Sequence, residues 1–382
     1  NIMKSKIKIL HVITHLPIGG AQDNTLYTVE LLDKEKYDIS LCCNLDGALV
    51  ERAKKIEAIK LFDIPFLCRE VSPYRDIRAF LSLYKLFKEE DFTIIHTHSS
   101  KAGLLARLAA VLNKTPIVIH TIHGFAFNDF MNMFKKNFFI YVEKLLAKWT
   151  DVLITVSNLN KKKIIDLNIA HENKIKNIYS GIDLRLFTNK RNDDFRKELN
   201  LENDHLLLGS VGRLSDQKDP ITMIEAFGII SKPFPNAHLA LVGDGKLKGK
   251  ILEKIDKLKL NGKVHLTGNK NNPWSVYHSM DLFIMSSIYE GLGRSITEAL
   301  SCGVPVVCTD VEGVPEIVRD NITGILVPPK DSNKLADGII RTLNDMETAK
   351  KMAEEGRRFV NDNFDVNKMV NDIDSLYNTL LS

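Results

Sequence analysis

Two glutamates at a fixed spacing are the residues of this sequence that most clearly suggest chemistry. Glu290 and Glu298 bracket seven residues, and the first stands directly before a glycine-rich turn at 291–293. Apolar runs lead into and out of this stretch, which predicts a strand, a loop, a short helix and a second strand. The N-terminus of such a helix can bind an anion, and glycines let backbone N–H groups approach it.

The separation of the two glutamates limits the kind of ligand. In a helix, residues eight positions apart are separated by roughly 12 Å along the axis. The two carboxylates of a glycosidase flank one bond at about 5–9 Å. The spacing of Glu290 and Glu298 therefore fits poorly with an acid and a base at one bond. It favours a longer ligand that is contacted at two points with phosphates between them, and a nucleotide sugar has that form.

Two cations follow another predicted strand. Arg213 and Lys218 come after the apolar run 206–211, and Pro220 then opens a helix. A diphosphate leaving group needs such charges, because Arg binds it with paired hydrogen bonds and Lys as a point charge. The alternative is a pair of surface cations, but the position at a strand end favours the phosphate role. Further on, the strand 264–268 ends at Gly268, where a nucleotide base could stack or pair with backbone amides.

These residues need a scaffold, and the chain alternates predicted strands and helices. This alternation indicates an α/β fold with parallel sheets, in which ligands bind at the carboxyl ends of the strands. The polar stretch 188–204 predicts an interdomain linker, and helices fill the C-terminal end. Strands are predicted at 6–13, 37–44, 92–96, 116–120, 151–156, 206–211, 238–242 and 264–268, and helices at 49–59, 77–89, 104–112, 333–343, 349–360 and 366–381.

The first strand runs into a loop with Gly19 and Gly20, after which a helix begins. The dinucleotide pattern G-x-G-x-x-G is absent from this loop. The loop is interpreted as one that approaches a phosphate or an acceptor, and the alternative is a tight turn.

Histidines gather at two later strand ends: His96 and His98, then His120 and His123. Residues two apart in a strand share a face, so His96 and His98 could converge on one point. A zinc site is one interpretation, but the spacing matches no known metalloenzyme pattern. A neutral histidine that hydrogen-bonds a sugar hydroxyl or a phosphate is favoured, with His123 best placed because Gly124 follows it. Packing of polar groups at strand ends is the alternative for His96 and His98.

The stretch 125–149 is rich in aromatic and basic residues. Part of it is predicted to be a core helix, because Phe138, Val142, Leu145 and Trp149 recur at helical spacing. Its remaining aromatic residues could lie in the interface of an anionic membrane or in the core. Candidates for contact with an acceptor or a membrane are Gln22, His98, Phe127, Lys135 and Lys136.

Composition limits the class of protein. A length of 382 residues allows two domains, and a net charge of +4 gives no reason to expect a nucleic-acid partner. Five scattered cysteines and the lack of a signal peptide predict a reducing cytoplasm. No apolar run approaches the ~18 residues of a membrane span.

The motifs together resemble glycosyltransferase family 4, the retaining enzymes of GT-B fold, over essentially the whole chain. The motifs are Gly19-Gly20, His123-Gly124, Arg213 to Asp219, and the two glutamates. The resemblance implies two Rossmann-like domains that face each other across a cleft. An acceptor-binding domain would span residues 1–185 and be completed by a helix at 365–382. A domain that binds the nucleotide-sugar donor would span 186–364.

The resemblance also implies roles for single residues in the donor domain. Glu298 would hold the ribose and Glu290 the donor sugar. The backbone amides of Leu292 and Gly293 would meet the diphosphate beside Arg213 and Lys218, which would replace a metal. No cofactor is expected.

In the other domain, the resemblance implies that Gly20 would border the phosphates and that His123 would contact the donor sugar. The sequence departs from the family pattern at Gln22, where an acidic residue is frequent, and at Ser180, where Asn is usual. Gln22 therefore puts an acidic role at that position in doubt.

The expected activity is transfer, with retention, of a hexose or N-acetylhexosamine from a nucleotide sugar to a glycan or lipid-linked acceptor in surface polysaccharide synthesis. UDP is favoured by family frequency alone. The expected location is the cytoplasm, with peripheral contact at the inner face of the plasma membrane. A nucleotide-sugar 2-epimerase and a non-catalytic glycan- or nucleotide-binding protein are the alternatives.

Overall fold

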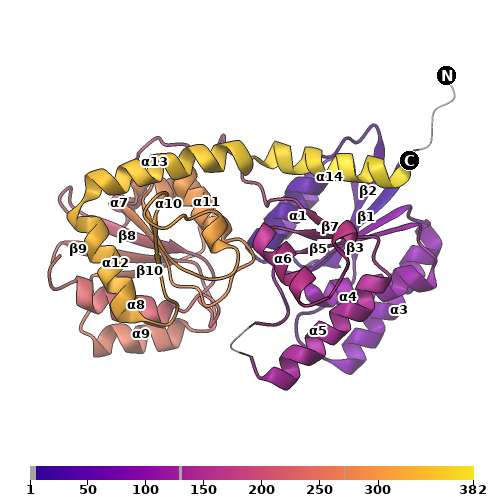
Figure 1. Cartoon of the computed structure of the whole chain (residues 1–382), viewed down its shortest axis with the longest axis horizontal. Helices are drawn as coiled ribbons and strands as arrows, with labels where there is room; N and C mark the ends of the chain where they lie inside the picture. Colours follow the sequence, from indigo (N-terminus) through magenta and orange to yellow (C-terminus); the bar gives the residue numbers. More distant parts are fainter. Residues whose placement is uncertain (1–5, 129–130, 271) are drawn as a thin grey trace. The chain divides into compact units, whose positions relative to one another are not determined.

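The computed structural model describes residues 6–128, 131–270 and 272–382, and the chain divides into two compact units (Figure 1). Unit 1 comprises Asn1–Gly181 and Asn367–Ser382, and unit 2 comprises Ile182–Val366. The predicted division, after residue 185 and before residue 365, lies close to these limits. None of the described helices is long and apolar enough to span a bilayer.

Unit 1 is built on a sheet whose described strands are all parallel, in the order β3-β2-β1-β4-β5-β6-β7. The inner strands are short apolar runs, which a sheet covered on both faces requires. The strands are β1 Ile7–His15, β2 Tyr37–Asn44, β3 Ile59–Asp63, β4 Ile94–His98, β5 Ile117–Ile122, β6 Val152–Thr155 and β7 Ile175–Asn177.

Helices cover both faces of this sheet. Apolar side chains of α3 and α4 pack on one face with Leu10, Val12 and Ile95, and α5 packs farther along that face. Helices α1 and α14 cover the other face, where Ile13 and His96 point (Figure 1). The helices are α1 Gly20–Leu31, α2 Val50–Lys54, α3 Pro73–Glu90, α4 Ser100–Leu112, α5 Met133–Lys148, α6 Asn158–Asp166, the 3₁₀ turn Glu172–Lys174 and α14 Val366–Leu381.

Unit 2 repeats the design with a parallel sheet whose described strands have the order β10-β9-β8-β11-β12-β13. In both units the chain starts in the middle of the sheet, runs to one edge and returns past the start, as in a Rossmann fold. The strands are β8 Leu206–Val211, β9 Ala237–Val242, β10 Val264–Gly268, β11 Leu282–Met285, β12 Val306–Thr309 and β13 Ile325–Val327.

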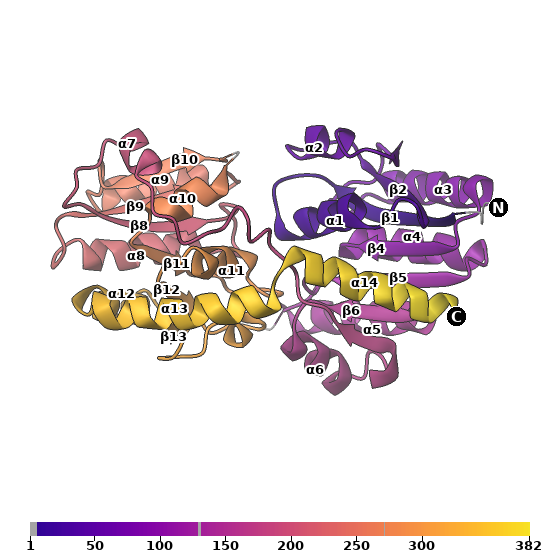
Figure 2. The ribbon, with the colours of Figure 1, turned by 90° about the horizontal axis from the view of Figure 1, so that it is seen from above.

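The core of unit 2 lies between this sheet and α8, α9 and α12, which contribute Phe227, Ile251 and Ile339. Helices α10 and α11 lie on the other face, and α13 packs against α11 (Figure 2). The helices are α7 Asp194–Glu198, α8 Pro220–Ile230, α9 Lys248–Lys257, α10 Pro273–Ser279, α11 Arg294–Ser301, the 3₁₀ turn Val314–Glu316, α12 Ser332–Asn344 and α13 Met346–Asn363.

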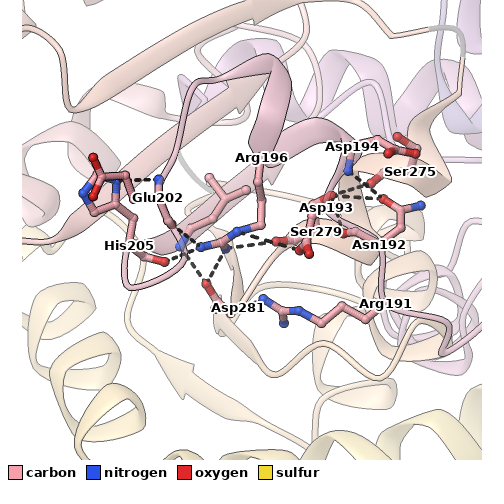
Figure 3. A network of polar contacts seen from close by, with 11 residues as sticks. Arg191, Asn192, Asp193, Asp194, Arg196, Glu202, His205, Ser275, Ser279 and Asp281 are labelled. Carbon is pink, nitrogen blue, oxygen red and sulfur yellow. Dashed lines mark hydrogen bonds and ion pairs between the residues drawn. The ribbon is translucent and has the colours of Figure 1, made fainter.

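The polar stretch 188–204 is part of unit 2 and does not act as a linker, so that prediction is wrong. Its Arg196 is buried and donates to Asp281 Oδ2 at 3.0 Å and to the carbonyl of His205 (Figure 3). Arg191 donates to the other oxygen of Asp281 at 2.8 Å. A polar sequence can be held firmly when its charges meet one partly buried carboxylate, here that of Asp281 just before β11.

Two further predictions are corrected. The helix predicted at 49–59 ends at Lys54, and the short edge strand β3 follows it. The predicted core face of α5 is also wrong, because Phe138 and Trp149 are exposed whereas Ile140, Leu146 and Ala147 are buried. Helical periodicity identified the helix but selected the wrong face, since both faces of α5 carry apolar residues.

Candidate functional site

In unit 2 the amine of Lys218 forms an ion pair with Oε1 of Glu290. Glu290 is buried, and the hydroxyl of Ser287 donates to the same oxygen at 2.7 Å. Lys218 follows β8 and Glu290 follows β11, so neighbouring strand ends bring the two residues together although they lie far apart in sequence. Ser287 was not predicted as a site residue, and no sequence motif marks it.

The two loops that carry Lys218 and Glu290 are bonded to each other. Ser286 donates through its hydroxyl to the carbonyls of Lys218 and Asp219, at 2.8 and 2.9 Å. The amide of Ile288 donates to the carbonyl of Gln217 at 2.8 Å. Helix α8 then begins at Pro220, with the Asp219 side chain accepting from the amide of Thr222. The position of the cation is therefore fixed by backbone contacts.

Glu298 lies on α11, and its carboxylate contacts Tyr277 and Arg294. The hydroxyl of Tyr277 donates to its Oε2 at 2.8 Å, and Nε of Arg294 lies 3.2 Å from its Oε1. Tyr277 is completely buried, and burial beside the carboxylate raises the pKa of its phenol well above the ordinary value. The phenol is therefore a fixed hydrogen-bond donor that orients Glu298. Tyr277 was missed from the sequence because α10 carries no recognisable motif.

A hollow lies at the carboxyl ends of β8, β9 and β11, and Arg213, Lys218 and Ser287 are among the residues that line it. Arg213 is exposed at its rim. Close backbone contact shapes this edge: Gly243 has a φ of 141°, and a Cβ there would lie 2.0 Å from the carbonyl oxygen of Gly212. The structure thus places the two predicted cations at one hollow, which suits an anionic ligand.

The glycine-rich turn leads directly into α11. Gly293 is the residue before the helix and has a φ of 92°, which favours glycine. Leu292 is buried and anchors the turn. The start of α11 therefore lies between the two glutamates, as predicted. Gly268 has a φ of 68°, and its carbonyl accepts from the amide of Gly243 at 2.9 Å, so it lies beside the edge of the hollow.

In unit 1 Gly20 is exposed and opens α1 after β1. The side chain of Gln22 donates to the carbonyl of His15 at 3.4 Å, so it binds the loop that leads into the helix. Gly47 packs under the same loop with a φ of 119°, where a Cβ would lie 2.4 Å from the backbone of Leu16. Gly47 was not predicted as part of this site because it lies far in sequence from the loop with Gly19 and Gly20.

The histidines separate into two groups. His98 is buried, and its Nδ1 lies 3.0 Å from Nε2 of the half-buried His123. His96 stacks on His98 with ring centres 4.4 Å apart, as their shared strand face predicted. His11 of β1, which was not predicted, joins this group at 3.1 Å from His98. His120 faces Gly103 of α4, and its Nδ1 lies 2.8 Å from Oγ1 of Thr97 on the neighbouring strand β4.

The burial of this histidine group has two consequences. Burial lowers the pKa of His11 and His123 to about 3, so both rings are neutral at physiological pH. His98 is completely buried, so the predicted direct contact between its side chain and an acceptor is wrong.

Ring nitrogens of His11, His96 and His98 lie within 4.8 Å of one another, a spacing that a metal ion could use. The zinc interpretation groups His96, His98, His120 and His123, whereas the structure brings together His11, His96 and His98. Hydrogen bonds between the rings, Tyr377 and Thr121 already use these nitrogens. The absence of a metal requirement stays a prediction.

The candidate membrane contacts also differ from one another. Phe127 is 1% exposed and packs in the core beside Ile122 and Ile140, so its predicted membrane contact is wrong. Lys135 is exposed on α5, and Lys136 is half-buried there.

Comparisons with known sequences agree with this arrangement. Residues 18–186 match the family described as Glycosyltransferase Family 4, and residues 191–359 match Glycosyl transferases group 1. The chain is 33% identical over 378 residues to the UDP-Gal:alpha-D-GlcNAc-diphosphoundecaprenol alpha-1,3-galactosyltransferase of Escherichia coli, covering 98% of this chain and 97% of that protein. It is 29% identical to the capsular polysaccharide biosynthesis glycosyltransferase CapM of Staphylococcus aureus, covering 98% and 97%.

Solved structures share the fold. HepE of Anabaena, in complex with UDP and glucose, superposes with a TM-score of 0.84 at 20% identity, covering 98% of this chain and 100% of that one. WaaG, a glycosyltransferase involved in lipopolysaccharide biosynthesis, superposes with a TM-score of 0.77 at 16% identity, covering 96% and 98%. From the full-length relative, the two family matches and the paired parallel sheets, it follows that the chain belongs to glycosyltransferase family 4 and has the GT-B fold.

Proposed function

We propose that this glycosyltransferase moves a hexose or N-acetylhexosamine from a UDP sugar to a glycan or lipid-linked acceptor, with retention at the anomeric carbon. The observation that carries the proposal is the Lys218–Glu290 ion pair at the hollow that Arg213 also lines. A cation and a carboxylate held together there can contact adjacent parts of one donor, the diphosphate and the sugar. The E. coli relative, by its name, uses UDP-galactose and a diphosphoundecaprenol acceptor.

In this proposal unit 2 binds the donor. Lys218 and Arg213 bind the diphosphate, together with the backbone amides of Leu292 and Gly293 at the start of α11. Glu290 binds the hydroxyls of the sugar, and Glu298, oriented by Tyr277, binds those of the ribose. Gly268 borders the base.

In the same proposal, unit 1 binds the acceptor and adds contacts with the donor. Gly20 at the start of α1 borders the phosphates, and His123 accepts a hydrogen bond from the donor sugar. Gln22 lies two residues beyond Gly20 on the same helix and is proposed to contact the acceptor.

Retention follows from attack on the face that the leaving group departs from. The acceptor hydroxyl oxygen bonds to the anomeric carbon while the bond from that carbon to the diphosphate oxygen breaks. The hydroxyl proton passes to the departing diphosphate oxygen. Lys218, Arg213 and the amides of α11 stabilise the charge that develops, and in this proposal they do so without a metal.

The test uses the full chain with UDP-glucose, UDP-galactose, UDP-GlcNAc and UDP-GalNAc, each with and without a synthetic α-GlcNAc-diphospho-lipid. Transfer of one sugar, with an α linkage by NMR, is the expected result. A β-linked product would overturn retention. Isomerisation of the donor sugar without an acceptor would instead identify the epimerase, and binding of UDP sugars without turnover would identify a binding protein.

We also propose that α5 of unit 1 contacts an anionic membrane, which would bring a lipid-linked acceptor to the enzyme. Phe134, Phe138 and Tyr141 are 83%, 61% and 60% exposed and recur at helical spacing on one face. The single acidic residue of α5, Glu143, pairs with the buried Arg107. The outer face is left with aromatic and lysine side chains, which suits an interface with anionic lipid.

Cosedimentation with phosphatidylglycerol vesicles and with phosphatidylcholine vesicles tests this contact. The Phe134→Ser/Phe138→Ser variant is expected to bind anionic vesicles at least about tenfold more weakly. Leu252→Ser on α9, which removes an exposed leucine from unit 2, serves as the control. Equal binding to both kinds of vesicle, or unchanged binding of the double variant, would exclude the contact.

A further inference from the structure

A row of rings runs through unit 1 from His123 to the C-terminal helix. Nε2 of His123 lies 3.0 Å from Nδ1 of His98, and Nε2 of His98 lies 3.1 Å from Nδ1 of His11. Nε2 of His11 lies 3.4 Å from the hydroxyl of Tyr377, which lies 2.6 Å from Nδ1 of His96. We propose that this row fixes the tautomer of His123, with Tyr377 of α14 as the positioning residue that sets its direction.

Each imidazole ring in the row is neutral, so it donates a hydrogen bond on one side and accepts one on the other. A neutral imidazole has one N–H donor and one nitrogen acceptor, so each bond determines the tautomer of the next ring. His11, His96, His98 and Tyr377 are completely buried, and burial keeps the imidazole pKa values well below the ordinary one. Among the described residues, the hydrogen bonds along the row join only imidazole rings and hydroxyl groups, so no carboxylate there holds a second proton on any ring.

The hydroxyl of Tyr377 has one proton for two histidine neighbours. Hydroxyl donors form bonds of about 2.5–3.0 Å, whereas N–H donors form bonds of about 2.7–3.2 Å. The 2.6 Å contact with Nδ1 of His96 fits the hydroxyl as the donor, and Nε2 of His96 then donates to Thr121 Oγ1 at 2.7 Å. The Tyr377 oxygen is left to accept from Nε2 of His11.

The remaining protons follow from that choice. Nδ1 of His11 must accept, so Nε2 of His98 donates to it. Nδ1 of His98 must then accept, so Nε2 of His123 carries the proton. The lone pair of His123 lies on Nδ1, the nitrogen outside the row. His123 would therefore meet a hydroxyl group of the donor sugar as an acceptor. This last step rests on the proposed function, whereas the direction of the row does not.

The far end of the row is well anchored. The Tyr377 ring packs edge-on against Tyr37 with ring centres 6.1 Å apart. One turn earlier on α14, Asp374 accepts from the Tyr37 hydroxyl at 2.6 Å and pairs with Lys36 at 2.9 Å. Helix α14 thus holds the hydroxyl in place against the sheet, far along the row from His123.

Histidine NMR on the full chain, with ¹⁵N-labelled imidazoles, reads the tautomers directly. The chain has 11 histidines, and His123→Gln assigns the signal of interest. We expect the Nε2–H form of His123 in the unaltered protein and a mixture of tautomers in Tyr377→Phe, which retains the buried ring. Tyr84→Phe on α3 is the matched control and should change nothing. An unchanged His123 signal in Tyr377→Phe would overturn the proposal.

Kinetic measurements test the proposed contact of His123 with the donor separately from the order of tautomers along the row. Tyr377→Phe is expected to lower kcat/KM with the UDP sugar about tenfold, the scale of one lost hydrogen bond. His98→Gln should retain more activity than His98→Phe, because the glutamine amide can both donate and accept a hydrogen bond. A tautomer change without a kinetic change would refute the contact of His123 with the donor, and the row would stand. A stoichiometric metal retained by the purified chain and bound to these nitrogens would refute the row.

Discussion

Replacing Lys218 with Ala would test the ion pair on which the proposed donor site depends. The substitution removes the amine that pairs with Oε1 of Glu290. Glu290 is 7% exposed, and after the substitution the hydroxyl of Ser287 still donates to its Oε1. The variant therefore combines two effects: a buried carboxylate loses its counter-charge and, under the proposed function, the diphosphate loses a cation.

The two effects have different magnitudes. Breaking a buried ion pair costs about 3–5 kcal/mol, but the Lys218 side chain is 23% exposed and partly screened by water. We therefore expect a loss of about 2 kcal/mol in the free energy of unfolding. For a unit the size of 182–366 this lowers the thermal midpoint by roughly 4–8 °C. Loss of one transition-state donor lowers kcat by about 10²–10³.

The assay measures thermal midpoints and UDP-sugar turnover on matched variants. Lys246→Ala is the control, because Lys246 also pairs with a carboxylate, that of Asp216, but both side chains are well exposed. The double variant Lys218→Ala/Glu290→Gln should regain stability, since a buried amide needs no counter-charge. It should not regain activity. If Lys218→Ala kept both its midpoint and its activity, the reasoning about the pair would be refuted.

Three further predictions concern the same two units. Tyr277→Phe should weaken UDP binding about tenfold by calorimetry, because Glu298 loses an orienting hydrogen bond; unchanged affinity would show that Glu298 does not hold the ribose. EDTA should leave activity intact if Lys218 and Arg213 replace a metal, and full loss would overturn the metal-free mechanism. The free energy of unfolding should fall as pH drops from about 6.5 towards 3, because the unfolded chain protonates histidines that the folded chain keeps neutral. By pH 5.5 the loss should be about 1.4 kcal/mol for each buried histidine. His11→Asn should flatten this slope in thermal melts, and an unchanged slope would contradict the assignment.

Much of the architecture could be predicted because its signals are local. Strands such as β2 and β8 are short apolar runs with turn residues at each end, and they were located correctly. The glycine-rich turn and the start of α11 follow from the same kind of local chemistry. Where local signals were weak, prediction failed: β3 is an edge strand with polar residues such as Lys60 and Asp63, so no apolar run marks it.

The partners of the predicted residues depend on tertiary structure. Ser287, Tyr277 and His11 have no motif of their own, and each becomes part of a candidate site only because a strand or helix brings it beside a predicted residue. The burial of a side chain also depends on tertiary structure. Phe127 and Phe134 are similar residues in one aromatic stretch, but one is 1% exposed and the other 83%.

The strand order explains why the candidate residues gather where they do. In each sheet the order reverses direction once, between β1 and β4 in unit 1 and between β8 and β11 in unit 2. Chain connections leave opposite faces of the sheet on the two sides of such a point, which opens a crevice at the strand ends. Lys218 follows β8 and Glu290 follows β11, so the ion pair spans the crevice of unit 2.

The histidine row occupies the equivalent position in unit 1. His11 lies on β1 and His98 at the end of β4, and their hydrogen bond crosses the point of reversal. His120 lies on β5, beyond that point, and its ring faces α4. The two units therefore present their functional groups at the same topological place, one with an ion pair and the other with a chain of neutral rings. Under the proposed function, a charged group would suit the crevice that binds the diphosphate, and a neutral, oriented acceptor would suit the one that meets a sugar hydroxyl.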